Sequence, residues 1–210
     1  MTAVRRRRFD PEANRAAILS AAESCFLARG YAGTSMSEIA KGSGVTKSLI
    51  HHHFGSKDAL WAEVKRRRFS EYHAQQMKLL SPETLTPELM RESMETYFRF
   101  LLDNPATLRM NAWMQLEGDR DNTESVIEMR DEGIARIRAA QEAGLLRRDV
   151  EAPFMLLTFL GLVQAWFMDP TMAEQRDAGS DHTAALAYLD SAWKIFAAGV
   201  SVGPHDTTDA

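Results

Sequence analysis

One short stretch, Ser35–Lys57, constrains the fold more than any other part of the chain, and it reads SMSEIAKGSGVTKSLIHHHFGSK. Met36, Ile39 and Ala40 follow the i, i+3, i+4 spacing that places apolar side chains on one side of a helix. Gly44 interrupts this pattern, and glycine bends a chain at low cost because it tolerates positive φ. The stretch therefore predicts a short helix that ends in a tight turn.

A second short helix is expected directly after this turn. Thr46 is placed to cap it, because a threonine hydroxyl can accept a hydrogen bond from a free backbone N–H one turn into a helix. The side chains available for packing are Val45, Leu49, Ile50 and Phe54, and the outward-facing candidates are Lys47, Ser48, His51 and His52. The spacing of Ala40, Gly44 and Ile50 favours a DNA-binding helix-turn-helix, whose second helix lies in the major groove. An ordinary helical hairpin is the alternative.

Charge is distributed unevenly along the chain. The net charge is −4, but residues 1–68 carry 13 Lys+Arg and 6 Asp+Glu, whereas residues 69–210 carry 12 and 23. A basic first part and an acidic remainder are typical of a nucleic-acid-binding module joined to a domain that stays away from DNA. The basic arm Arg5–Arg8 could contact phosphate or a minor groove, or it could be a solvated tail.

Two features of the sequence are typical of a cytoplasmic protein. The single cysteine, Cys25, excludes an internal disulfide and is typical of a reducing environment. The arginine-rich start leads into a polar stretch, unlike a signal peptide, and the apolar segment Phe154–Met168 is too short to span a bilayer. We therefore expect a cytoplasmic protein without a membrane segment.

The whole chain is expected to be all-α, with about nine helices. Asp10 can cap a first helix that begins at Pro11 and ends near Arg29, and Ser56 can cap the fourth helix. Further helices are expected near residues 87–103, 105–117, 123–143, 153–169 and 182–201. The pattern breaks near SPETLTP, which predicts a DNA-binding domain over 1–55, a connecting helix over 56–80, a second helical domain over 81–203 and a tail over 204–210. The run Lys65–Arg68 is expected to be a solvated helix face.

The last two long helices predict a contact between two copies of the chain. The first is apolar on more than one face and therefore needs partners on more than one side, and the second carries an apolar stripe. We therefore expect a four-helix seam in a homodimer, with a wholly internal core as the alternative. The residues expected at this seam are Phe154, Leu157, Gly161, Ala165, Leu189, Trp193 and Phe196.

No pattern in the sequence favours catalysis or metal binding. Consecutive residues of a helix point about 100° apart, so His51–His53 cannot converge on one metal ion. The acidic run Glu117–Glu124 lacks the glycine and the distal glutamate of an EF-hand loop, and Asn122 or Thr123 is expected to cap the next helix there. We expect no cofactor, no metal and no enzyme activity.

A longer run, FLARGYAGTSMSEIAKGSGVTKSLIHHHFGSKDALWAEV, resembles the N-terminal domain of TetR-type transcriptional repressors over about residues 12–66. The matching residues are Phe26, Gly30, Tyr31, Thr34, Ile39, Ala40, Gly44, Val45, Ile50, Phe54, Lys57 and Leu60. The chain departs from the family at His51–His53, where one or two tyrosines more often precede a histidine and a phenylalanine. The resemblance implies a homodimeric repressor that binds a palindromic DNA operator and is released by a small-molecule effector.

Site residues follow from the helix pattern and the resemblance together. The expected DNA-binding residues are Thr34, Thr46, Lys47, Ser48, His51, His52 and Lys57, with Thr34 and Lys57 on phosphates and Lys47 and Ser48 best placed to read bases.

The resemblance also implies that the domain over 81–203 binds the effector and dimerises. The residues expected around the ligand are Met94, Tyr97, Met110, Trp113, Met114 and Trp166, while Arg109, Gln115 and Glu117 could orient it. Two other functions stay open at this point: an architectural DNA-binding dimer without an effector, and an all-α enzyme that carries the hairpin by coincidence.

Overall fold

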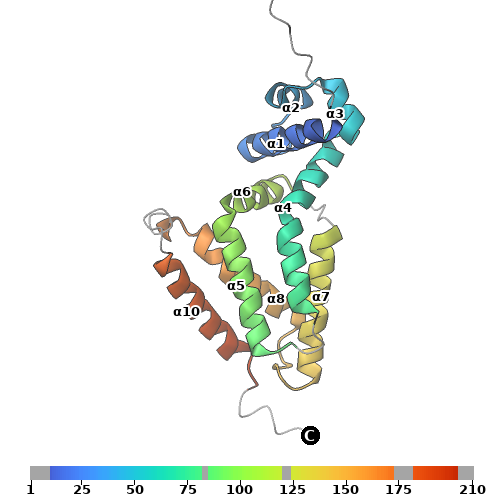
Figure 1. Ribbon diagram of the computed structural model, residues 1–210. Helices are drawn as coiled ribbons and strands as arrows, with labels where there is room; N and C mark the ends of the chain where they lie inside the picture. Colours follow the sequence, from blue (N-terminus) through green and yellow to red (C-terminus); the bar gives the residue numbers. More distant parts are fainter. Residues whose placement is uncertain (1–9, 82–84, 120–123, 173–181, 203–210) are drawn as a thin grey trace, which may run out of the picture. The chain divides into compact units, whose positions relative to one another are not determined.

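The computed structural model describes residues 10–81, 85–119, 124–172 and 182–202, and every regular element among them is helical (Figure 1). The elements are α1 (Pro11–Arg29), α2 (Met36–Ser43), α3 (Lys47–Phe54), α4 (Lys57–Leu80), α5 (Pro87–Asp103), α6 (Pro105–Leu116), α7 (Glu124–Glu142), α8 (Ala152–Met168), the 3-10 turn η1 (Pro170–Met172) and α10 (Thr183–Val200). The predicted all-α class with about nine helices is confirmed. The predicted basic arm, the Asn122 or Thr123 cap and the tail lie outside the described residues.

Local capping explains where several helices begin. The Asp10 side chain accepts hydrogen bonds from the backbone N–H groups of Glu12 and Ala13, at 3.1 Å each, and Pro11 takes the first position of α1. Thr86 caps α5 in the same way through the N–H of Leu89, at 3.3 Å. These bonds satisfy donors that a helix start would otherwise leave without a partner.

Two compact units divide the chain, and the division differs from the predicted domains. The first unit contains residues 1–69 and 106–123, and the second contains residues 70–105 and 124–210. The boundary therefore falls inside α4, and almost all of α6 belongs to the first unit. The physical reason is Met110 of α6, which is 0% exposed and packs in the core that α1–α4 form.

The core of the first unit is built around α1 and the start of α4. Its buried members are Ile18, Leu19, Ala22, Phe26, Met36, Ile39, Ile50, Leu60, Trp61, Val64 and Met110. The rings of Phe26 and Trp61 lie 4.8 Å apart at an angle of 59°, in the tilted arrangement that aromatic pairs favour. Cys25 is partly buried against this core.

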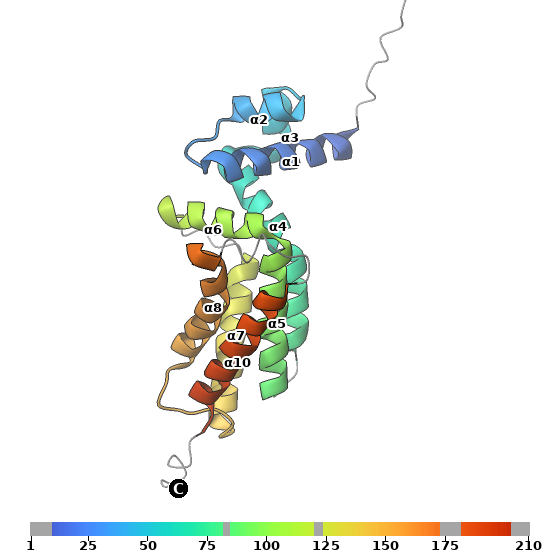
Figure 2. The same ribbon diagram turned by 90° about the vertical axis from the view of Figure 1, so that its left-hand side faces the viewer.

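In the second unit, α5, α7, α8 and α10 run side by side as a bundle (Figure 2). Its buried residues include Met90, Met94, Phe98, Leu101, Ile137, Met155, Phe159, Val163, Trp166, Leu189 and Phe196. Two polar pairs lie within this apolar interior: Gln76 exchanges two hydrogen bonds with Ser93, and the Gln164 amide donates to the Tyr97 hydroxyl at 2.8 Å. Among the described helices, none is both long enough and apolar enough to cross a membrane.

Candidate nucleic-acid interface and its supports

The predicted helix-turn-helix is present in the first unit. Gly44 ends α2 in the left-handed region, with φ 70° and ψ 18°, and its N–H donates to the Ala40 carbonyl at 3.0 Å. The Thr46 hydroxyl accepts from the Leu49 N–H at 3.2 Å, which caps α3 as predicted. Ile50 is completely buried. The turn chemistry therefore fixes α3 with one face in the core.

The opposite face of α3 is exposed in the part of the chain that the structure describes. The exposed side chains that it carries, with Thr46 at its start, are Lys47, Ser48, His51 and His52. A lysine, two histidines and two hydroxyls give this face hydrogen-bond donors and acceptors together with positive charge. Such a face can contact both phosphates and base edges.

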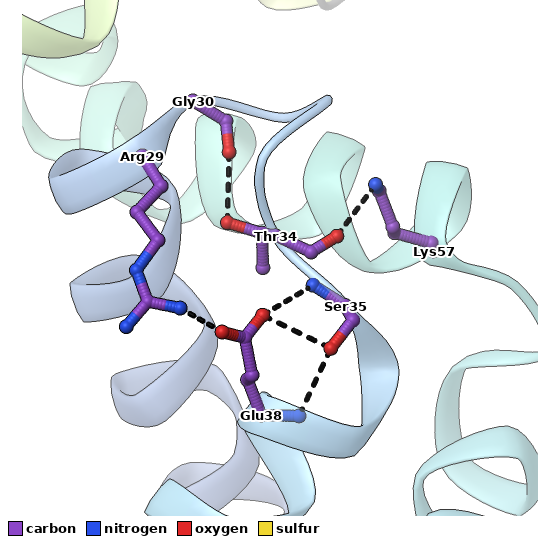
Figure 3. A network of polar contacts seen from close by, with 6 residues as sticks. All are labelled: Arg29, Gly30, Thr34, Ser35, Glu38 and Lys57. Carbon is purple, nitrogen blue, oxygen red and sulfur yellow. Dashed lines mark hydrogen bonds and ion pairs between the residues drawn. The ribbon is translucent and has the colours of Figure 1, made fainter.

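Thr34 does not fit its predicted role as a phosphate contact. The residue is 2% exposed, and its hydroxyl donates to the Gly30 carbonyl at 2.8 Å (Figure 3). A hydroxyl has a single hydrogen to donate. Because this hydrogen is already used inside the protein, Thr34 closes the turn after α1 instead of presenting a donor to DNA.

Lys57, the other predicted phosphate contact, lies at the first position of α4 and reaches back to the same turn. Its ammonium donates to the Thr34 carbonyl at 2.7 Å (Figure 3). It also stands 4.1 Å from the centre of the Tyr31 ring. These two contacts offset the unfavourable position of a cation at a helix start. An ammonium has three donors, and the bond to Thr34 uses one of them.

A capping box stabilises the start of α2, next to the turn after α1. The Glu38 N–H donates to the Ser35 hydroxyl oxygen at 3.2 Å, and the Ser35 N–H donates to the Glu38 carboxylate at 2.9 Å (Figure 3). The carboxylate also pairs with Arg29 from the end of α1. These contacts link the end of α1, the start of α2 and the start of α4. We call this group the corner, and its residues are Arg29, Gly30, Thr34, Ser35, Glu38 and Lys57.

Next to this corner, Glu117 makes a contact that the sequence did not predict. Its two carboxylate oxygens accept hydrogen bonds from the backbone N–H groups of Tyr31, at 2.9 Å, and Ala32, at 3.0 Å. The role expected for it, orienting a ligand, is at odds with this geometry because both oxygens already serve the turn after α1.

Gly30 is required where this contact forms. Its φ of 71° with ψ −179° lies in a region that only glycine adopts readily. A Cβ there would stand 2.4 Å from Glu117 Oε1 and 2.7 Å from a ring carbon of Trp113. The glycine therefore permits both the backbone path and the close approach of the segment that follows α6.

Asp119 adds a second contact from the same segment. Its Oδ2 accepts from the Trp61 indole N–H at 2.7 Å and from the Lys65 ammonium at 2.9 Å. Lys65 is 2% exposed, and Arg68 pairs with Glu23 of α1, so the expectation that Lys65–Arg68 is a solvated face is wrong for these two residues. The partner that allows Lys65 to be buried is Asp119, more than fifty positions away, and no local sequence pattern relates the two residues.

The predicted ligand-binding residues do not all lie in one unit. Met94, Tyr97 and Trp166 are buried in the second unit. Met110, Trp113 and Met114 lie on α6 in the first unit, where the Trp113 indole donates to the Leu27 carbonyl at 3.1 Å and the two methionines pack on the core. Sequence could not separate the two groups, because a Met-rich and Trp-rich helix looks the same in either core.

One small pocket in the second unit has a different lining. It measures about 50 Å³, and its lining residues are Leu80, Leu85, Met90, Ser93, Gly133, Ile137, Leu156, Phe159 and Phe196. The only hydroxyl among them is that of Ser93, which donates to Gln76 at 2.7 Å and keeps acceptor capacity. Such a lining suits a mainly apolar molecule.

The seam residues predicted on the last two helices differ in exposure. On α8, Phe154 is 57% exposed, Leu157 is 66% exposed, and Gly161 and Ala165 are exposed between them and Met168. A Cβ on Gly161 would meet nothing within 4 Å, so packing within the chain does not require a glycine there.

On α10 two of the three predicted seam residues lie inside the unit, and Trp193 is half-buried. Leu189 and Phe196 are buried, and the Trp193 ring lies 6.3 Å from that of Phe196. The exposed face of α10 carries Ile195 instead, at 66%. The burial of Leu189 and Phe196 within the chain is at odds with their predicted place at the seam, and sequence could not show this because both faces of α10 are apolar.

Comparison with known proteins agrees with this geometry. Residues 18–64 match the model for bacterial regulatory proteins of the tetR family, and residues 93–192 match the model for a tetracyclin repressor-like C-terminal domain. Over 148 residues the chain is 30% identical to the HTH-type transcriptional repressor AcnR of Corynebacterium efficiens, covering 67% of this chain and 72% of that protein. The chain belongs to the TetR family.

Other TetR-family relatives extend over most of the chain. The HTH-type transcriptional repressor SCO4008 of Streptomyces coelicolor is 24% identical over 175 residues, which is 82% of this chain and 88% of that protein. The fold matches that of a TetR family transcription regulator from Marinobacter aquaeolei, with a TM-score of 0.69, 15% identity, and coverage of 91% of this chain and 97% of the other. Membership of this family makes the protein a DNA-binding transcriptional regulator and not an enzyme.

Ion pairs made by Glu63 connect α1 to α4 within the DNA-binding unit. The Glu63 carboxylate accepts from Arg66 at 2.7 and 2.8 Å and pairs with Arg15 of α1. The hydrogen bond from Arg66, followed by that from Arg15, lowers the pKa of Glu63 from its ordinary 4.5 to about 2.

This pKa shift predicts a pH dependence of stability. Because the folded state lowers the pKa, Glu63 stabilises the fold above about pH 4.5, and this contribution is lost as the pH falls towards 2. We expect the difference in unfolding free energy between the wild type and Glu63→Gln to be constant above about pH 5 and to shrink below it. Urea unfolding followed by circular dichroism between pH 2 and 7 measures this difference. Glu71→Gln, an exposed change on the same helix, is the control, and a Glu63→Gln difference that stays constant down to pH 2 would contradict the assignment.

Proposed function

We propose that this TetR-family protein is a homodimeric repressor, that α3 of each subunit binds one half of a palindromic operator, and that a small mainly apolar effector releases it. The observation that carries the proposal is the exposed polar face of α3, set opposite a buried Ile50 on a helix capped at Thr46. A rigidly held helix with free donors is what base reading requires.

Two subunits are part of the proposal because one short helix gives few base contacts. Two recognition helices reach consecutive turns of the major groove when they are about 34–36 Å apart. The apolar stripe Phe154, Leu157, Gly161, Ala165 and Met168 on α8, with Ile195 of α10, is the proposed dimer face. An exposed apolar stripe of this length on a monomer is a typical sign of an interface.

The effector is proposed to bind the second unit at the pocket that Ser93 borders. The pocket of about 50 Å³ is smaller than ligand sites, which commonly occupy about 300–1,000 Å³. An effector would therefore favour a more open arrangement of the bundle, and it can act on DNA only if the operator favours the closed one. A coupling of about 1–3 kcal/mol between the two states is enough for regulation.

The small size of this pocket also favours one competing function. An architectural DNA-binding dimer would use the second unit only for dimerisation and would need no effector cavity. A ligand screen by thermal shift separates the two functions, because a ligand that binds the folded state raises its apparent stability. Apolar compounds that stabilise the protein and weaken its binding to the operator support the repressor, and the absence of any such compound supports the architectural dimer.

The DNA-binding assignment predicts different effects for Lys57 and Ser48. Lys57→Ala should weaken binding to all duplexes alike and reduce the slope of log affinity against log salt by about 1 for each subunit, because a phosphate contact is lost. Ser48→Ala should instead change the preferred base at one position of each half-site. Selection from a random duplex pool followed by salt titration measures both effects.

Lys78→Ala is the matched control for charge, because Lys78 is exposed at the other end of α4 and in the second unit. It should leave the salt slope unchanged. If Lys57→Ala and Lys78→Ala behave alike, and Ser48→Ala selects the wild-type sequence, the assignments of Lys57 and Ser48 are wrong.

The dimer face predicts that Leu157→Asp separates the subunits without unfolding them. Leu157 is 66% exposed, and exposed substitutions usually change stability by only about 0.5 kcal/mol. Two aspartates facing each other in an apolar seam would repel and be desolvated. Sedimentation equilibrium should show at least about tenfold weaker association. Leu116→Asp, at 79% exposure on α6, should remain dimeric, and a dimeric Leu157→Asp would refute this interface.

A further inference from the structure

His51 differs from its neighbours on α3 because one of its ring nitrogens is already bound. Its Nδ1 lies 2.8 Å from the carbonyl oxygen of Gly55, one turn further along the chain. The ring nevertheless belongs to an exposed residue. The bond holds the imidazole against the end of α3, and among the described residues Nε2 has no hydrogen-bond partner.

This bond determines which hydrogen-bonding group His51 presents. A carbonyl oxygen can only accept, so Nδ1 must carry the hydrogen. In the neutral imidazole Nε2 then has a lone pair and no hydrogen. Neutral His51 held in this way cannot donate from Nε2 to a phosphate, because phosphate oxygens are acceptors as well.

The groups that can donate to Nε2 from DNA are few. In the major groove only the amino groups of adenine, at N6, and cytosine, at N4, are donors, whereas guanine offers acceptors and thymine offers an acceptor and a methyl group. His51 lies one helical turn after Lys47, on the exposed side of α3. A ring fixed at both its Cβ and Nδ1 loses little further freedom when it binds.

We propose that neutral His51 is a specificity-determining residue, which accepts through Nε2 a hydrogen bond from the amino group of an adenine or a cytosine in each operator half-site. The inference rests on the proposed operator binding and deepens it. His52 has no such role, because its ring makes no comparable backbone bond among the residues described and lies edge-on to His53, with 5.7 Å between the ring centres. His51 therefore recognises one position of each half-site by the amino group of the base there.

The test removes that amino group from the DNA. Each adenine of the selected operator is replaced in turn by purine, and each cytosine by 2-pyrimidinone, which lack only the amino group. Affinities are measured by fluorescence anisotropy at pH 8, where free histidine is neutral. At one position, wild-type affinity should fall about 3- to 10-fold for each substituted half-site, as expected for one lost hydrogen bond.

The same series is measured on protein variants. His51→Phe keeps a planar ring without nitrogens and should show no loss at that position beyond the general effect of the altered base pair. His51→Gln restores an acceptor and should regain sensitivity to the amino group. His52→Phe is the matched control and should behave as the wild type. Circular dichroism and melting temperature show whether each variant retains its fold.

Three results would overturn the inference. They are a wild type that is indifferent to every amino group, a His51→Phe variant as sensitive as the wild type, and a guanine preference that His51→Phe removes. The first result is informative even if His51→Phe fails to bind. A wild type that binds no duplex at all would instead contradict the operator binding itself, so the two failures can be told apart.

Discussion

The two hydrogen bonds accepted by Glu117 are the interaction on which the DNA-binding unit depends. They come from consecutive backbone N–H groups, those of Tyr31 and Ala32, directly after Gly30 has ended α1. The Tyr31 N–H is half-buried, and such a group without a partner costs up to about 1–3 kcal/mol, which the Glu117 carboxylate removes while it also binds the exposed N–H of Ala32. Because Glu117 follows α6, a segment from the middle of the chain completes a fold that begins at its start.

The consequences of this contact extend to the starts of α2 and α4. Tyr31 donates its hydroxyl to Asp58, and this hydrogen bond raises the pKa of Tyr31 to about 12, so the hydroxyl stays a donor. The face of the Tyr31 ring also lies under the Lys57 ammonium, which in turn binds the Thr34 carbonyl. The turn after α1 therefore fixes the starts of both α2 and α4, and α3 lies between these two helices in the chain. A change at α6 could alter this corner without any contact with DNA.

Sequence predicted the helices well and the long-range contacts poorly. Caps and breaks at Asp10, Gly44, Thr46 and Ser56 act over a few residues, so their effect can be read locally, and the structure has each of them. Glu117 and Asp119 looked like part of a connector, because their partners lie more than fifty residues away. Thr34 and His51 show another limit of prediction from sequence. Their residue types suit DNA contact, but only the structure shows that the Thr34 hydroxyl and one His51 nitrogen already make hydrogen bonds within the protein. On α10, where both faces are apolar, only packing shows that Phe196 is internal and Ile195 is not.

The most direct test of this account is amide hydrogen exchange in the full-length protein, compared between the wild type and Glu117→Gln. Glutamine keeps the size of the side chain but has one acceptor oxygen, and its NH₂ group would face the second backbone N–H. The account predicts that exchange at Tyr31 and Ala32 becomes at least about tenfold faster, which corresponds to about 1.4 kcal/mol of lost protection, while amides of α10 in the second unit exchange as before. Unchanged exchange at Tyr31 and Ala32 would contradict the claim that Glu117 completes the DNA-binding unit.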